Sequence, residues 1–110
     1  MKLKDVVKLQ KQAFKRRIEL RFKKGHDYAS EADCLDNFKK MARLCKILQL
    51  DVSKPYAVAL FFVVHKLLRL QNLVQNNKTP ENESVLDTID DALNYLDLTR
   101  ENLIDQVKGE

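Results

Sequence analysis

Apolar residues recur at steps of three and four along most of this chain, and few residues interrupt them. The 110 residues include only two glycines and two prolines, so long helices with few breaks are expected. The most β-tolerant stretch, Ala57 to Val64, follows Pro55 and continues with helical spacing, so no strand is predicted. The sequence therefore predicts an all-α fold: a four-helix, bundle-like single domain over residues 1–110 with short connections.

The boundaries of the helices follow from capping residues. Gly25 stands where a C-cap glycine belongs, so residues 26–30 are expected to form a loop. Ser53 is the expected N-cap of the third helix, with Pro55 in its first turn, and Thr79 and Pro80 fit the same roles for the fourth. The expected helices span about 3–24, 30 or 33 to 49, 54–75, and 79 or 80 to 94, the last with an apolar pattern that can extend it to the C-terminus.

The core is expected to centre on the third helix, which is the most apolar. Its predicted core residues are Ala57, Leu60, Phe61, Val64, Leu67, Leu68 and Leu73. The predicted inner face of the second helix is Cys34, Phe38, Met41, Ala42, Cys45 and Leu48. Leftover apolar positions such as Leu98, Leu103 and Ile104 suggest burial in a homo-oligomer, a dimer or higher. No apolar run approaches the roughly 20 residues of a membrane span, so a cytoplasmic protein without a membrane partner is expected.

The two ends of the chain have opposite charge, although the net charge is only +4. Residues 1–24 carry ten Lys/Arg against two acidic residues, whereas residues 79–110 carry nine Asp/Glu against two basic residues. These ends can pack against each other within one chain or between subunits. The basic first helix, residues 1–24, can alternatively bind the phosphates of a nucleic acid.

A row of polar side chains follows one face of the expected fourth helix. Glu83, Asp87, Asp91 and Asn94 recur at steps of four, four and three, whereas Val85, Leu86, Ile89, Leu93 and Leu96 line another face. Like charges four residues apart destabilise a helix by roughly a few tenths of a kcal/mol per pair. The row is therefore either a solvated face that tolerates this cost or a place for a cation. Because carboxylates suit Mg²⁺, Glu83, Asp87 and Asp91 are candidate metal ligands.

Two cations interrupt the apolar third helix. Lys66 and Arg69 lie three residues apart, and both side chains can bind phosphate. The alternative is that they extend from the edge of the core or form salt bridges with the acidic fourth helix. His65 beside them fits a half-buried core histidine better than a base. Cys34 and Cys45 lack the spacing of a metal or redox site, so they are interpreted as reduced thiols.

A polar segment between the first two helices holds Asp27 and Tyr28, with Asn37 further along the chain. A carboxylate, an aromatic ring and an amide can together contact a base or a sugar. An ordinary capping turn is the alternative interpretation.

Several of these segments resemble a known family when taken together. They are Asp27-Tyr28, Asn37-Phe38, Lys66-Leu67-Leu68-Arg69-Leu70, Glu83-Ser84, Asp87, Asp91 and Asn94-Tyr95. In this pattern the chain resembles, over about residues 18–98, the small phage and bacterial proteins called nucleotide-modification-associated domains. Those proteins are similar to the all-α nucleoside triphosphate pyrophosphatases of the MazG and dUTPase type.

The resemblance implies a candidate nucleotide-binding core over residues 25–98, with Asp87 and Asp91 as magnesium ligands. It implies nucleoside triphosphates as substrates, cut between the α- and β-phosphates. An earlier glutamate cluster of those enzymes has no counterpart here, since Glu19 stands alone among basic residues. A Mg²⁺-dependent pyrophosphatase or hydrolase and a non-catalytic protein that sequesters a nucleotide therefore both remain open.

Two other classes of function also remain open. One is a nucleic-acid-binding module that uses the basic first helix. The other is a helical adaptor in which the basic and acidic surfaces bind other proteins.

Overall fold

The computed structural model describes residues 1–28, 33, 35–76 and 83–109, and it leaves the side chains of residues 24–28 and 83 undescribed. The chain forms four helices: α1 (Leu3–Tyr28), α2 (Asp36–Leu48), α3 (Pro55–Gln75) and α4 (Glu83–Gly109). No strand occurs in these residues, so the predicted all-α class is confirmed.

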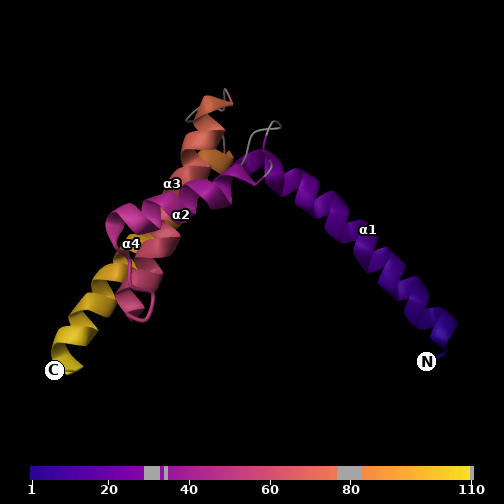
Figure 1. The fold of residues 1–110 in the computed structure, drawn as a ribbon, viewed down its shortest axis with the longest axis horizontal. Helices are drawn as coiled ribbons and strands as arrows, with labels where there is room; N and C mark the ends of the chain where they lie inside the picture. The colour runs from indigo at the N-terminus through magenta and orange to yellow at the C-terminus, as the bar shows by residue number, and fades with distance from the viewer. Residues whose placement is uncertain (29–32, 34, 77–82, 110) are drawn as a thin grey trace.

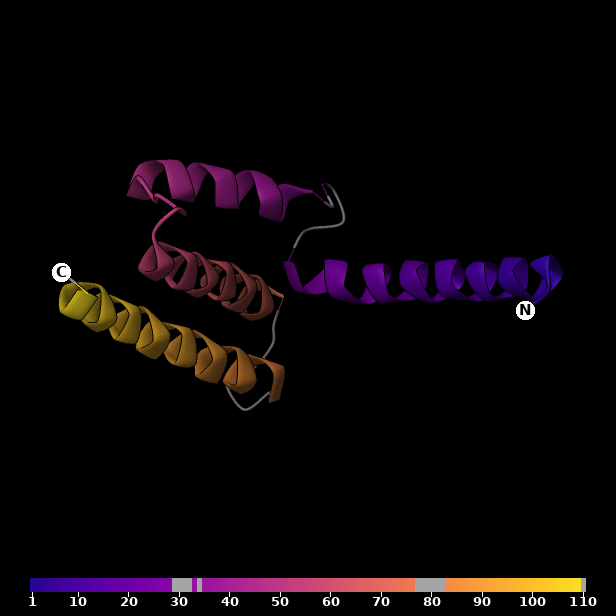
Figure 2. The ribbon, with the colours of Figure 1, turned by 90° about the horizontal axis from the view of Figure 1, so that it is seen from below.

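α3 is the central element of the fold. α4 runs antiparallel along it over the most extensive interface, and α2 packs against α3 as well (Figures 1 and 2). Only the C-terminal end of α1 approaches α3, and the rest of α1 projects as an arm. The radius of gyration is 18.2 Å, whereas a compact domain of 100 residues has about 13 Å. Within one chain, the predicted bundle therefore contains three helices and leaves α1 outside.

α4 contacts α3 through a seam of mostly small or hydroxyl-bearing side chains. The seam repeats at steps of three and four and consists of Val85, Thr88, Ala92, Tyr95, Thr99 and Asn102, all buried or half-buried. The hydroxyl of Thr88 donates to the carbonyl of Ser84 at 2.6 Å, and that of Thr99 donates to the carbonyl of Tyr95 at 2.8 Å. Because both hydroxyls bond within their own helix, burying them against α3 costs little.

The seam lies one residue away from the apolar face predicted for this helix. Of the predicted face only Val85 is buried, while Leu86, Leu93 and Leu96 are exposed and Ile89 is half-buried. Successive helix residues are about 100° apart, so a one-residue rotation moves these leucines beside the interface. Small seam residues let two helix axes approach closely, and that packing outweighs the larger apolar area of the leucines.

α2 shows a similar rotation. It buries Asn37 and Met41, whereas 67% of the surface of Phe38 is exposed, contrary to the predicted inner face. Ala42 and Leu48 are also exposed. Cys45 is half-buried and not in a disulfide, and Cys34 lies outside the described residues.

The predicted end of the first helix was wrong. α1 continues through Gly25 to Tyr28, so the expected C-cap and the loop at residues 26–28 are helical. A glycine inside a helix costs only about 1 kcal/mol, which the neighbouring helix formers can offset. α2 correspondingly begins later than expected, at Asp36.

The start of α3 was predicted only in part. Pro55 occupies the first turn as expected, but the N-cap residue is Lys54, without a side-chain capping bond. The backbone N–H and the hydroxyl of Ser53 instead donate to Oδ1 of Asp51, at 3.1 and 2.7 Å. The expected capping residues of α4, Thr79 and Pro80, lie outside the described residues. The predicted extension of the fourth helix is confirmed, because α4 continues to Gly109.

α3 is long and apolar enough to cross a membrane by length and composition, which differs from the expectation drawn from the sequence. The core helix of a soluble protein passes the same test. Of the apolar window of α3, 28% is buried in the single chain, where α2 and α4 pack against the helix, and its second half contains Lys66 and Arg69.

Burial along α3 distinguishes its predicted core residues. Ala57, Val64 and Leu73 are buried, whereas Leu67 is exposed. Leu60, Phe61 and Leu68 are half-buried. The core of the single chain is therefore narrower than the sequence predicts.

A matched pair of leucine substitutions tests this core. Leu73 is 2% exposed and Leu67 is 50% exposed on the same helix. We expect Leu73→Ala to lower the free energy of unfolding by about 2–5 kcal/mol, because it leaves a cavity. Leu67→Ala should cost about 1 kcal/mol or less, because the site is half solvated. Urea denaturation of both variants measures the difference, and equal losses would contradict this packing.

Candidate functional site

An ion pair connects α3 to α4 at the edge of the seam. Nζ of Lys66 lies 3.5 Å from Oδ2 of Asp91. The lysine side chain is only 17% exposed and the aspartate side chain is 47% exposed, so the pair sits where the core meets solvent. The predicted cation on the third helix and the predicted carboxylate on the fourth therefore lie on the same side of the bundle.

Two contacts fix the register of the antiparallel helices. The rings of Phe62 on α3 and Tyr95 on α4 stack with centroids 5.1 Å apart. Lys66 comes four residues after Phe62, and its partner Asp91 comes four residues before Tyr95, as expected of antiparallel helices. Continuing this register brings Arg69 to the level of Thr88, between the levels of Asp91 and Asp87. Arg69 is half-buried, and its Nε atom is buried.

The polar residues predicted on α4 share one flank of the seam. Asp87, Asp91 and Asn94 each directly precede a seam residue, which places them on the side that Lys66 approaches. Asp87 and Asn94 are exposed and Asp91 is half-buried. The side chain of Glu83, the third predicted metal ligand, lies outside the described residues.

Two carboxylates whose side chains the structure describes, Asp87 and Asp91, are the predicted metal ligands on this flank. In the part of the chain that the structure describes, no group of three or more His, Cys, Asp or Glu side chains converges. Mg²⁺ commonly binds through one or two carboxylates together with phosphate oxygens and waters. A magnesium ion at Asp87 and Asp91 would therefore need phosphate oxygens and waters as its further ligands.

The remaining predicted contacts lie around α2 and the end of α1. Asn37 is buried on α2, which packs against α3. Asp27 and Tyr28 belong to the last turn of α1, but their side chains lie outside the described residues. Their predicted contacts with a base or a sugar therefore stay predictions.

His65 is half-buried on α3 next to the two cations. Burial is the main cause that lowers its pKa, and the positive charges of Lys66 and Arg69 lower it further. The imidazole is therefore neutral at pH 7, as expected of a core histidine.

Reasoning from the sequence missed two features of the molecule. One is the stacking of Tyr95 on Phe62, which could be suspected only from the aromatic type of both residues. The other is a hollow of about 330 Å³ on α1, lined by Leu9, Gln12, Ala13 and Arg16. All four lining residues belong to α1, so the hollow is separate from the flank beside Lys66.

Comparisons with protein-family models, with curated proteins and with solved structures gave no match. A functional assignment must therefore come from the residues themselves.

The lowered pKa of His65 predicts a pH dependence of stability. Above pH 6.5, the ordinary value, His65 is neutral in both the folded and the unfolded chain. As the pH falls below that value, the unfolded chain takes up a proton that the folded protein binds less readily, so the free energy of unfolding falls. Urea denaturation at pH 7.5 and pH 5.5 should show a smaller decrease for His65→Gln than for the wild type, since His26 is present in both. An unchanged decrease would rule out this assignment.

Proposed function

We propose that this protein binds a nucleoside phosphate together with Mg²⁺ on the flank formed by α3 and α4. The observation that supports the proposal is the approach of Lys66 to Asp91 at 3.5 Å, with Arg69 one turn further along α3. A nucleotide requires cations for its phosphates and carboxylates for its metal ion. Both kinds of group lie at the same edge of this bundle.

Each residue then has a distinct role. Arg69 can form two parallel hydrogen bonds with phosphate oxygens, and Lys66 supplies a compact positive charge. Bound Mg²⁺ would neutralise phosphate charge, and Asp87 and Asp91 are the residues that would hold it. In the ligand-free protein, Asp91 serves instead as the counter-ion of Lys66.

Amide and aromatic groups would bind the rest of the nucleotide. Asn37 and Asn94 each offer a donor and an acceptor, and Asp27 and Tyr28 remain the proposed contacts for base or sugar. This assignment describes a cytoplasmic nucleotide-binding protein of the MazG-like type, such as a phage encodes. Release of pyrophosphate by the bound nucleotide would make it a hydrolase, and binding without turnover would make it a sequestering protein.

Thermal unfolding with a panel of nucleoside mono-, di- and triphosphates tests the proposal. A nucleotide at 100 times its Kd should stabilise the fold by about 2.7 kcal/mol and raise the Tm by several degrees. EDTA should reduce the shift, and Asp87→Asn should reduce it with Mg²⁺ present. Asp105→Asn, which also removes an exposed carboxylate from α4, is the matched control and should behave as wild type.

Pyrophosphate detection on the same panel then separates hydrolysis from sequestration. The absence of any nucleotide-dependent shift, or equal shifts for wild type and Asp87→Asn, would contradict the proposed site.

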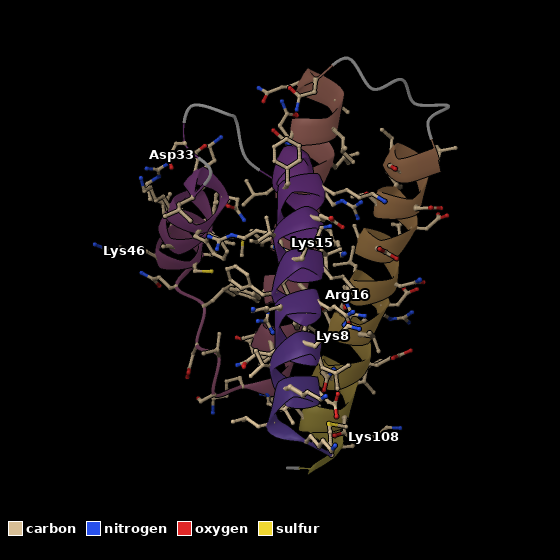
Figure 3. The ribbon with its side chains drawn as sticks, turned by 90° about the vertical axis from the view of Figure 1, so that its right-hand side faces the viewer. Lys8, Lys15, Arg16, Asp33, Lys46 and Lys108 are labelled. Carbon is tan, nitrogen blue, oxygen red and sulfur yellow. The ribbon has the colours of Figure 1, made fainter. Side chains whose placement is uncertain are left out.

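A second candidate function follows from the exposed arm. Lys8, Lys15 and Arg16 lie along α1, which stands in front of the bundle in Figure 3. α1 carries nine Lys/Arg against three Asp/Glu, and a basic helix held in solvent can bind the phosphate backbone of nucleic acid.

Titration of labelled DNA and RNA at several salt concentrations tests this second function. We expect Arg16→Glu/Arg17→Glu to weaken binding about tenfold or more and to flatten its salt dependence, because fewer counterions are released. Lys46→Glu/Lys54→Glu makes the same charge change outside the arm and should have less effect. Equal effects of the two variants would indicate non-specific attraction to net charge.

A further inference from the structure

The surface of α4 next to the seam is a second apolar face with nothing packed on it in the single chain. We call it the leucine stripe: Leu86, Leu93, Leu96, Leu103 and Val107, all exposed. Its spacing of seven, three, seven and four is that of a helix that packs along another helix. The stripe extends over 22 residues, from Leu86 to Val107, or about 32 Å. Exposed apolar surface of this length marks a place where another element binds.

The projecting part of α1 has the same need for an apolar partner. Eight large apolar side chains on α1 are exposed: Leu3, Val6, Val7, Leu9, Phe14, Ile18, Leu20 and Phe22. Four residues that share one face, Leu3, Val7, Phe14 and Ile18, form what we call the arm stripe. Binding to nucleic acid would use the basic residues of α1 but would leave this apolar surface in water.

Charges flank the two stripes in matching positions. In α1, Lys4, Lys8 and Lys15 directly follow Leu3, Val7 and Phe14, and Lys11 falls on the same face. We call these four the lysine stripe. In α4, Asp90, Asp97 and Glu101 directly follow Ile89, Leu96 and Arg100, and we call them the acidic stripe. All seven charged residues are exposed.

These positions select an antiparallel orientation. When two helices pack antiparallel, the flanks that follow their apolar stripes meet on the same side of the interface. In a parallel pair, each such flank meets the opposite flank of its neighbour. Charge pairs beside a helix interface set which helices pair and in which orientation. The lysine stripe of α1 lies beside the acidic stripe of α4 only when the two helices pack antiparallel, so the charges favour that orientation.

α1 does not reach α4 within its own chain. In Figure 1 the two helices diverge from a common apex, with α1 running toward the apex and α4 away from it, and in Figure 2 they extend to opposite sides of the molecule. A two-fold axis close to, but displaced from, the line that bisects this angle brings α1 of a second copy next to α4 of the first. It places a second copy's α1, running toward the apex, alongside α4, which gives the antiparallel orientation that the charges favour.

We propose that two copies of this protein exchange arms, with α1 of each copy packed antiparallel on the leucine stripe of the other. The two contacts are related by a two-fold axis, so the assembly closes as a dimer. α1 and α4, with 26 and 27 residues, have nearly equal lengths to pair. In the single chain, three helices pack together and α1 projects as an arm. In the dimer, α1 of the second copy becomes the fourth helix of the bundle.

Complementation between two full-length variants tests the exchange. Sedimentation equilibrium should show a dimer for the wild type at about 50 µM. Leu93→Asp/Leu96→Asp removes the accepting face and Val7→Asp/Phe14→Asp removes the arm face, so each variant alone should be a monomer. Mixed in equal amounts they should form a 1:1 heterodimer, because one intact arm still meets one intact stripe. Phe38→Asp/Ile47→Asp, on exposed sites of α2, is the matched control and should remain a dimer.

A charge exchange tests the orientation without changing apolar surface. Lys8→Glu/Lys15→Glu and Asp90→Lys/Asp97→Lys should each weaken the homodimer about tenfold, and mixing the two should restore wild-type affinity. Circular dichroism checks that each variant is folded. If the Leu93→Asp/Leu96→Asp variant does not fold, Leu93→Ser/Leu96→Ser is used in its place. The exchange would be overturned if the wild type were a monomer, if either single-face aspartate variant remained a dimer, or if the α2 control dissociated. It would also be overturned if the mixture of the two apolar-face variants stayed monomeric, or if the mixture of the two charge variants did not recover the wild-type affinity.

Discussion

The antiparallel contact between α3 and α4 is the interaction on which the rest of this molecule depends. It is built from small and hydroxyl-bearing side chains, with Val85 and Thr88 fully enclosed and Thr99 nearly so. Its register brings Lys66 to Asp91 and carries Arg69 past the two aspartates of α4. The proposed contacts for phosphate and Mg²⁺ are therefore a consequence of how these two helices align, whereas the proposed contacts for base or sugar also come from α1 and α2.

The sequence predicts the helices better than the faces they bury. Spacing and the scarcity of glycine and proline were enough to identify four helices and to place Pro55 in a first turn. The same reasoning assigned the leucines of α4 to the core, because a prediction from hydrophobic periodicity favours the face that carries the largest apolar side chains. The actual seam uses Thr88 and Ala92, whose advantage is close approach to a neighbouring helix. That advantage depends on a helix distant in the sequence, so the pattern of α4 alone does not contain it.

The candidate site shows the same division. The cations of α3 and the carboxylates of α4 could be named from residue type and spacing, and the structure brings Lys66 and Asp91 together. The sequence left open whether Lys66 binds phosphate or forms a salt bridge with the fourth helix. The structure shows the salt bridge, and its partner, Asp91, depends on the register of the two helices. The sequence also left open whether the basic and acidic ends meet within one chain. The divergence of α1 from α4 answers that question for the single chain.

Three faces of α4 are one residue apart: the aspartate flank, the seam with α3 and the leucine stripe. Each helix residue turns about 100°, so inserting or deleting one residue near the middle of α4 would rotate everything downstream onto the wrong neighbour. After a deletion the downstream leucines would face α3, and after an insertion the downstream seam residues would take the place of the leucine stripe. This helix should therefore tolerate many exposed substitutions over evolution while its length between Val85 and Asn102 stays constant.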